Sequence, residues 1–102
     1  MHRDLKIGNT FIDAQMQIKI GDFGLAYQFK DRTERRASFC GTPNYMAPEV
    51  CQNRERIEAT REGLSTIPEP SFYSLPVDVW ALGVIMYNLL YGKSPFSLGD
   101  TP

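Results

Sequence analysis

The sequence has few of the residues and patterns that mark several common classes of protein. Its 102 residues contain only two cysteines, Cys40 and Cys51, which lack a C-x-x-C spacing. Neither a zinc site nor a disulfide framework is therefore indicated, and a reducing compartment fits best. With 11 basic and 12 acidic residues, the formal charge of -1 leaves no basic excess for binding nucleic acid. We expect no nucleic-acid partner.

Long apolar segments are also missing. The first twenty residues contain no apolar core of a secretory signal. The longest apolar stretch, Val79 to Tyr91, is broken by Asn88 and is shorter than the roughly 18 to 20 residues that a membrane span needs. The stretch predicts a core helix. We expect no membrane association and an intracellular location, cytoplasmic or nuclear.

Two short motifs near the start combine carboxylates with glycine-containing turns. Residues 2–9 read His-Arg-Asp-Leu-Lys-Ile-Gly-Asn, and residues 21–24 read Gly-Asp-Phe-Gly. Each motif places a carboxylate, Asp4 or Asp22, beside a second polar group, an arrangement that suits divalent metal and phosphate oxygens. Either motif alone is unspecific, because Asp-Phe-Gly occurs by chance and a charged run is more often a solvated loop.

The segment between these motifs predicts a short β-hairpin. Residues 10–13 and 17–20 flank a polar turn at 14–16, and the second run alternates polar and apolar side chains. A hairpin here would fix the distance between the Asp4 and Asp22 loops, so that both carboxylates face one cleft. A plain core role for the strands is compatible with this.

Two further motifs, Ala47-Pro48-Glu49 and Asp78-Val79-Trp80, follow in the same order. Four ordered motifs make coincidence a poor explanation, and together they resemble the catalytic half of a eukaryotic protein kinase. Lys6 after Asp4, and Gly41-Thr42 before Pro43, follow the serine/threonine pattern. The run from Cys40 to Val50 is similar to that of the polo-like kinases.

This resemblance implies an α+β, protein-kinase-like fold that the chain covers incompletely: a mainly helical C-lobe with a short β-hairpin next to the active site. Residues 1–102 then form a partial protein kinase domain. It comprises a catalytic loop at 2–9, an activation segment at 22–49, an insertion at about 51–75 and a central helix at about 75–91. No G-x-G-x-x-G occurs in the sequence, so we expect the ATP-covering lobe to be missing and the isolated residues to be inactive.

The reaction that the resemblance implies is transfer of the γ-phosphoryl group of ATP to a serine or threonine hydroxyl of a protein substrate. Asp4 would orient that hydroxyl and accept its proton. Lys6 would neutralise charge on the transferring group, and Thr42 would tie the substrate loop to both residues. Implied ligands of Mg²⁺ are Asn9 and Asp22, and implied contacts of the nucleotide are Lys6, Asn9 and Asp22. Structural positions are implied for Phe23, Gly24, Glu49 and Asp78.

Residues 25–45 predict a flexible polar loop, in which Ser38 stands where the family has its regulatory phosphoacceptor. The resemblance implies that Arg3 reads a phosphate on Ser38. Arg35 and Arg36 resemble the site preferred by basophilic kinases, so an upstream activating kinase is an implied partner. Many kinases have a second basic residue where this chain has Tyr27. The plainer alternative for Ser38 is a solvated loop serine.

The spacing between Glu49 and Asp78 is longer than in most kinases, which indicates an insertion. Residues 52–62 predict a short exposed helix with Arg54 and Glu58 on one face, and residues 66–71 predict a loop. A genuine surface insertion and untrimmed intron sequence both fit. The sequence assigns no chemistry to this segment.

The central helix is predicted from Leu75 to Tyr91, with Ser74 as its N-cap, Pro76 in the first turn and Gly92 just past its end. It is apolar nearly all round, which predicts burial on every side. Asp78 is the exception. The resemblance implies that its carboxylate accepts hydrogen bonds from the backbone of the catalytic loop and so anchors that loop.

Two alternatives to an active kinase fit the sequence. One is a non-catalytic binding module that keeps a substrate-docking surface and has no ATP site, and for these 102 residues alone it is favoured over activity. The other, a pseudokinase, is disfavoured because the residues whose loss usually marks one are all present: Asp4, Lys6, Asn9 and Asp22.

Overall fold

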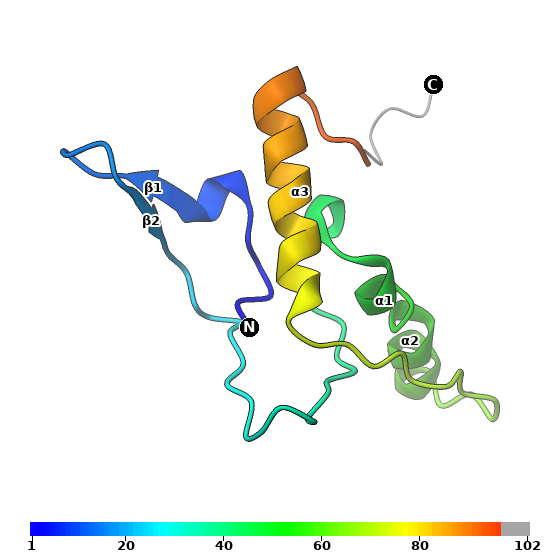
Figure 1. Ribbon diagram of the computed structural model, residues 1–102. Coiled ribbons are helices and arrows are strands. Elements are labelled where there is room, and N and C mark those ends of the chain that lie inside the picture. Colours follow the sequence, from blue (N-terminus) through cyan, green and yellow to red (C-terminus); the bar gives the residue numbers. More distant parts are fainter. Residues whose placement is uncertain (97–102) are drawn as a thin grey trace.

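A computed structural model describes residues 1–96. In chain order, these residues form a 3-10 turn at Ile7–Asn9, strands β1 (Thr10–Ile12) and β2 (Ile18–Ile20), a 3-10 turn at Pro43–Tyr45, and helices α1 (Pro48–Cys51), α2 (Arg54–Arg61) and α3 (Pro76–Tyr91). Helix α3 stands at the centre, with the hairpin on one side and α1 and α2 on the other (Figure 1). The irregular segment that follows β2 passes beneath it.

The predicted hairpin is confirmed. Strands β1 and β2 pair antiparallel, with Thr10 opposite Ile20 and Ile12 opposite Ile18. Asp13 closes the turn, because its Oδ1 accepts the backbone N–H groups of residues 15 and 17, each at 2.9 Å. The side chains of Ile12 and Ile18 are 65% and 72% exposed, so these strands do not belong to a core. Their pairing depends on backbone hydrogen bonds.

Helix α3 is confirmed, with a different start. Its N-cap is Leu75 instead of Ser74, and no side chain caps it. The reason is local: Pro76 has no N–H for the serine hydroxyl to accept, and the N–H of Val77 is bound to the Ser74 carbonyl oxygen at 3.1 Å instead. The helix ends at Tyr91, and Gly92 adopts a φ of 71°, the left-handed conformation expected of a glycine there.

The prediction that α3 is buried on every side is wrong for the described residues. Only Val77, Ala81 and Val84 are buried, along one face. Apolar side chains on other faces are widely exposed, including Val79 at 67% and Leu89 at 72%. Residues 1–96 supply no further element to cover them. Within those residues, none of the helices is both long enough and apolar enough to cross a membrane.

The buried core is small and lies where three segments meet. It consists of Ala47, Val50, Tyr73 and Val77, with Met1 and Met46 packed against it. Val50 comes from α1, a short helix that the sequence analysis did not predict; it begins at Pro48, a favourable first helical residue. Tyr73, from the end of the insertion, is only 3% exposed. The insertion therefore contributes to the core.

The insertion also contains the predicted exposed helix, α2, on which Arg54 Nε and Glu58 Oε1 are 3.0 Å apart. The two ends of the insertion are joined by Asn53, which is fully buried. Asn53 Nδ2 donates to the carbonyl oxygens of Glu49 at 3.3 Å and Ser71 at 2.8 Å, and its Oδ1 accepts the Ser71 N–H at 2.8 Å. One asparagine thus closes the 18-residue excursion.

Candidate active site

The predicted catalytic loop, residues 2–9, is fixed to α3 by Asp78. The Asp78 carboxylate accepts the backbone N–H of His2 at Oδ2, at 2.7 Å, and that of Arg3 at Oδ1, at 3.0 Å. Arg3 has a φ of 71°, in the left-handed region that non-glycine residues adopt at a cost of about 1 to 3 kcal/mol. Hydrogen bonds to a charged acceptor are strong enough to offset that cost. They therefore hold the backbone in a fixed conformation directly before Asp4.

His2 connects the two carboxylate loops. Its ring is buried, its Nδ1 accepts the Asp4 N–H at 3.1 Å, and its Nε2 contacts the Gly21 carbonyl oxygen at 2.9 Å. Because Nδ1 accepts, the ring proton is on Nε2, which donates to Gly21. Phe23, 62% exposed, meets the ring edge-on, with centroids 5.0 Å apart. The sequence analysis gave no role to His2.

Asp4, Lys6 and Thr42 form one hydrogen-bonded group. Thr42 Oγ1 donates to Asp4 Oδ1 at 2.7 Å and accepts from Lys6 Nζ at 3.1 Å. Lys6 Nζ is 4.0 Å from the other Asp4 oxygen, Oδ2. Gly41 permits this approach: its φ is 119°, and a Cβ there would lie 2.9 Å from the Arg3 carbonyl oxygen. A residue 38 positions away in the sequence therefore orients the Asp4 carboxylate.

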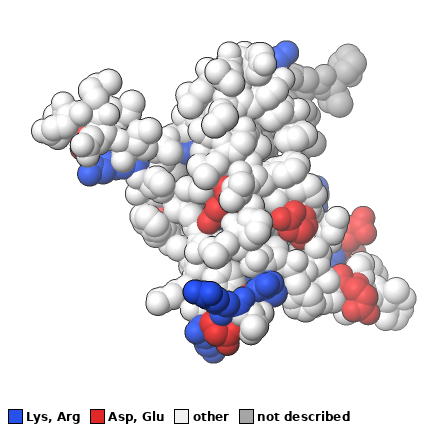
Figure 2. All heavy atoms as spheres, viewed as in Figure 1, with Lys and Arg blue, Asp and Glu red and all other residues white. Residues whose placement is uncertain are grey.

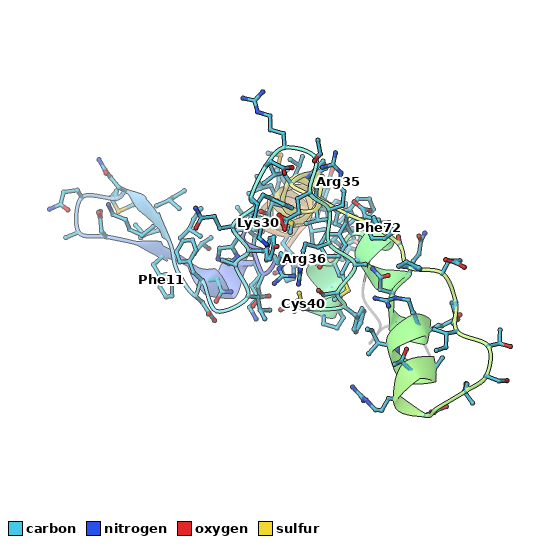
Figure 3. All side chains as sticks on the ribbon, turned by 90° about the horizontal axis from the view of Figure 1, so that it is seen from below. Phe11, Lys30, Arg35, Arg36, Cys40 and Phe72 are labelled. Atoms are coloured by element: carbon cyan, nitrogen blue, oxygen red, sulfur yellow. The ribbon has the colours of Figure 1, made fainter. Side chains whose placement is uncertain are left out.

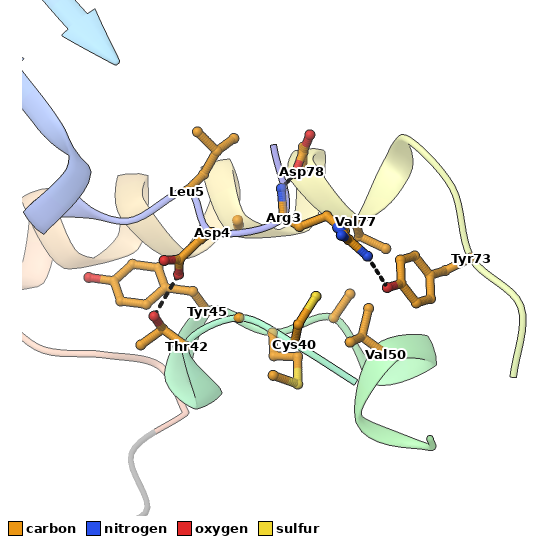
Figure 4. Close-up of a pocket in the computed structure, with 14 residues that line it drawn as sticks. Arg3, Asp4, Leu5, Cys40, Thr42, Tyr45, Val50, Tyr73, Val77 and Asp78 are labelled. Atoms are coloured by element: carbon orange, nitrogen blue, oxygen red, sulfur yellow. Dashed lines mark hydrogen bonds between the residues drawn. The ribbon is translucent and has the colours of Figure 1, made fainter. Parts of the chain in front are cut away.

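A small cavity lies between the catalytic loop, the segment around Thr42 and α3 (Figure 4). Asp4 and Thr42 line it, as do Cys40, Tyr45 and Tyr73. Asp22 is not among its lining residues. This cavity therefore does not unite the two carboxylates that the sequence analysis expected to face one cleft.

Asn9 and Asp22 each retain an oxygen that accepts no hydrogen bond from the described residues. Asn9 is buried, and its Nδ2 donates to the backbone oxygen of Asp4 at 2.8 Å and to Asp4 Oδ2 at 3.3 Å, leaving Oδ1 available. Asp22 Oδ1 accepts the Gly24 N–H at 3.2 Å, leaving Oδ2. No group of three or more His, Cys, Asp and Glu side chains suited to a metal occurs among residues 1–96. Amide and carboxylate oxygens nevertheless suit Mg²⁺, which binds few protein ligands.

The guanidinium group of Arg3 is directed at the backbone and at Tyr73. Its Nε donates to the Leu25 carbonyl oxygen at 2.7 Å and its Nη1 to the Tyr73 hydroxyl at 3.2 Å. The arginine at Ser38 is Arg36, whose Nη2 lies 3.4 Å from the serine Oγ. In the described structure, Arg3 therefore makes no hydrogen bond to Ser38.

The aromatic ring of Tyr27 lies close to the guanidinium groups of both Arg3 and Arg36. The Arg36 and Arg3 guanidinium carbons lie 4.2 Å and 5.7 Å from its ring centroid, within the range of cation–π attraction. Its hydroxyl donates to Glu34, which raises the pKa of Tyr27. The pKa of Glu34 is lowered, first by the hydrogen bond from the Lys30 N–H and then by that from Tyr27.

Basic side chains gather at the lower end of the molecule, over the segment that follows β2 (Figure 2). Lys30, Arg32 and Arg35 are exposed on this segment.

Glu49, in the first turn of α1, forms no ion pair within residues 1–96, and its carbonyl oxygen accepts a hydrogen bond from Asn53. The sequence placed Glu49 in a motif and did not indicate the contact with Asn53.

Three residues of the insertion reach the rest of the molecule and were missed. Besides Asn53, Tyr73 forms an antiparallel bridge with Arg36, and Arg56 Nη2 donates to the Ala37 carbonyl oxygen at 2.9 Å. An aromatic residue before a helix and an arginine on a charged helix are weak signals, because such residues are common on surfaces. Only the fold shows that these residues contact the segment around Ser38.

Comparison with known proteins gives consistent matches. The protein kinase domain model matches residues 1–101. The cell cycle serine/threonine-protein kinase CDC5/MSD2 of Saccharomyces cerevisiae is 45% identical over 98% of this chain and 12% of its own length. The serine/threonine-protein kinase PLK1 of Xenopus laevis is 45% identical over 94% of the chain and 13% of its own length. The serine/threonine-protein kinase polo of Drosophila melanogaster is 43% identical over 99% and 15%. The chain thus spans 15% or less of the length of these relatives.

Proposed function

From the premise that this chain belongs to the protein kinase family, as a partial domain similar to the polo-like and CDC5 serine/threonine kinases, we propose that the protein phosphorylates serine and threonine hydroxyls of other proteins. Its hairpin and helices form part of a protein-kinase-like fold, and the family implies ATP, typically with Mg²⁺. The observation that carries the proposal is the hydrogen-bonded group of Asp4, Lys6 and Thr42.

Asp4 is the proposed catalytic base. Thr42 holds one oxygen of its carboxylate, and the other lies within 4.0 Å of Lys6 Nζ. The carboxylate accepts the proton of the substrate hydroxyl while the hydroxyl oxygen bonds to the γ-phosphorus, and the bond from that phosphorus to the ADP oxygen breaks. Lys6 stabilises the negative charge on the transferring group. Thr42 orients the other two residues.

Asn9 and Asp22 are the proposed Mg²⁺ ligands, through Asn9 Oδ1 and the Asp22 carboxylate. The two hydrogen bonds from Asn9 Nδ2 to Asp4 turn its amide so that Oδ1 is left available. When bound, Mg²⁺ neutralises charge on the phosphate oxygens. Through Asn9, the position of the metal ligand depends on the position of the base. Lys6, Asn9 and Asp22 would all contact the nucleotide phosphates.

Ser38 is the proposed regulatory phosphoacceptor of an activation segment at 22–49, modified by an upstream kinase. Arg3 is proposed to couple a phosphate on Ser38 to the base, although its present partners are others: its backbone N–H is bound to Asp78 and its guanidinium to Leu25 and Tyr73, and Asp4 follows it directly. A phosphate that attracts this guanidinium would change the contacts of the residue before Asp4.

The proposal is tested in a completed protein, in which an ATP-binding lobe is joined to this chain, by following transfer of labelled γ-phosphate from ATP to a protein acceptor. We expect Asp4→Asn to lower turnover at least about 100-fold with ATP affinity nearly unchanged, because Asp4 faces the hydroxyl. Asp22→Asn should also weaken Mg-ATP binding, since Asp22 faces the metal. Glu55→Gln, an exposed site on α2, is the control. Full activity of Asp4→Asn would refute the assignment, and equal loss of ATP binding in both variants would contradict the separate roles.

A further inference from the structure

Two arginines from different parts of the chain contact Ser38 and the residue before it, Ala37. Arg36 precedes it on the activation segment, and its Nη2 lies 3.4 Å from Ser38 Oγ. Arg56 lies on α2, within the insertion, and its Nη2 donates to the carbonyl oxygen of Ala37 at 2.9 Å. Figure 3 shows Arg36 and Cys40, on either side of Ser38 in the sequence, on the segment that lies in front when the molecule is seen from below.

Both arginines keep a buried donor without an acceptor. Among the described residues, the only buried side-chain nitrogen or oxygen atoms that lack a hydrogen-bond partner are Arg36 Nε and Arg56 Nε. No carboxylate of residues 1–96 forms an ion pair with either group. Glu34, the acid nearest to Arg36 in the sequence, is bound by Tyr27 and by the Lys30 N–H. Glu58, on the helix of Arg56, is paired with Arg54. Buried N–H groups are normally paired, so unpaired donors on two arginines that contact Ser38 and Ala37 indicate a missing anionic acceptor.

We propose that Arg36 and Arg56 bind a phosphate carried by Ser38, so that α2 of the insertion clamps the activation segment when this serine is phosphorylated. The proposal rests on the regulatory role proposed for Ser38. An upstream kinase supplies the phosphate from a nucleoside triphosphate: the Ser38 Oγ–P bond forms, the bond from that phosphorus to the nucleoside diphosphate breaks, and the hydroxyl proton passes to solvent. The phosphate brings three acceptor oxygens and a charge of about -1.5 to -2.

The surroundings hold both arginines in place. Arg36 is fixed by the hydrogen bonds of its backbone with Tyr73, at 2.9 and 2.7 Å, and its guanidinium lies over the Tyr27 ring. Arg56 follows Asn53, the buried residue that closes the insertion, by three positions. Neighbouring Arg35 is different: it is exposed, and its Nη1 is bound to the carbonyl oxygens of Arg32 and Glu34. The clamp therefore consists of Arg36 and Arg56, without Arg35.

The test uses the full chain with phosphoserine incorporated at position 38 and follows the phosphate by ³¹P NMR during a pH titration. Two nearby guanidinium groups favour the dianion, so the pKa of this phosphate should be lower by about one pH unit than in a free peptide of residues 35–41. Arg56→Gln should abolish about half of that difference. Arg61→Gln, on the same helix and exposed, is the matched control and should leave it unchanged.

A phosphate pKa equal to that of the peptide, in wild-type protein that circular dichroism shows to be folded, would overturn the proposal. So would equal effects of Arg56→Gln and Arg61→Gln. If Arg56→Gln fails to fold, Arg56→Lys keeps the charge and loses the forked geometry, and an intermediate pKa is then expected. The measurement needs no catalysis, so the expected pKa together with inactivity of the completed protein, in which an ATP-binding lobe is present, refutes the proposed function and leaves the clamp standing.

Discussion

The carboxylate of Asp78 accepts the backbone N–H groups of His2 and Arg3, 76 and 75 residues earlier in the chain. This contact fixes the proposed catalytic loop, residues 2–9, to the first turn of α3. Since the following residue is Asp4, the position of the proposed base depends on a carboxylate that does not itself contact it in the described structure.

Asp78→Asn should therefore weaken both stability and turnover. The amide replaces one acceptor oxygen with an NH₂ group that faces a donor, and we expect a loss of about 2 to 5 kcal/mol in the free energy of unfolding. Urea denaturation measures that loss, with Glu69→Gln in an exposed loop as control. A variant as stable as wild type would show that the two hydrogen bonds contribute nothing.

In the completed protein, Thr42→Val should lower kcat without changing ATP affinity. Valine keeps the shape of threonine and removes the hydroxyl that donates to Asp4 and accepts from Lys6. Misorientation of the base should reduce turnover about 10- to 100-fold. Thr42→Ser keeps the hydroxyl and should retain most activity. Steady-state kinetics in which the concentrations of ATP and of the protein acceptor are varied separately measure both quantities. Equal kcat values for Thr42→Val and Thr42→Ser would contradict the prediction.

Asn53→Ala should destabilise the protein more than the removal of so small a side chain would suggest. It removes three hydrogen bonds at a fully buried site and leaves the Ser71 N–H without its acceptor, which we expect to cost about 2 to 4 kcal/mol. Thermal unfolding of this variant is compared with Gln28→Ala, an exposed amide. Equal melting temperatures would contradict the role of Asn53 in joining the ends of the insertion.

The pairing of Tyr27 with Glu34 should make part of the stability depend on pH. The folded-state pKa of Glu34 lies below its ordinary 4.5, so its contribution is present above pH 4.5 and is lost as the pH falls through the lowered value. Wild type should thus melt higher than Glu34→Gln at pH 7, and the difference should shrink below pH 4.5. The pKa of Tyr27 is raised above 10.0, so its contribution is lost only above pH 10.0. If the difference in melting temperature between wild type and Glu34→Gln instead grew as the pH fell, the predicted direction of the pH dependence would be wrong.

The 102-residue chain studied alone should self-associate through α3. Leu82, Met86, Leu89 and Leu90 are 50%, 64%, 72% and 71% exposed, at a spacing that places them on one face of the helix. Sedimentation velocity should show oligomers, and Leu82→Lys combined with Leu89→Lys should yield monomers. Gln15→Lys combined with Gln28→Lys adds the same charge elsewhere and should not. A monodisperse wild-type monomer would contradict the expectation.

The sequence predicted those parts of the fold that depend on local chemistry. The hairpin followed from an alternating run and a polar turn, α2 from Arg54 and Glu58 four residues apart, and the end of α3 from Gly92. One prediction failed for a local reason: Ser74 is not the N-cap because Pro76 lacks an N–H and the Val77 N–H is bound to the Ser74 carbonyl oxygen. The other failed because it depends on distant contacts: α3 is exposed because burial depends on neighbours that an apolar helix does not encode.

The candidate site divides in the same way. The chemistry of the proposed site residues follows from their residue types, and the spacing of the motifs identified them: Asp4, Lys6, Asn9, Asp22 and Thr42. The contacts of Arg36, Arg56 and Tyr73 could not be predicted, because the sequence alone does not tell how an insertion folds back. Which side chain reaches Ser38 is decided by the path of residues 51–75 through space.

The segment between Tyr27 and Arg36 is held at both ends, by the bond from the Tyr27 N–H to the Met1 carbonyl oxygen at 2.8 Å and by the Arg36–Tyr73 bridge. It is therefore a closed loop, and its ends stay together without help from the residues between them. The entropy of closing such a loop grows only slowly with its length. Evolution could thus lengthen, shorten or change most of this stretch at little thermodynamic penalty, whereas the anchors at Tyr27 and Arg36, and Glu34 bound to Tyr27, would change far less freely.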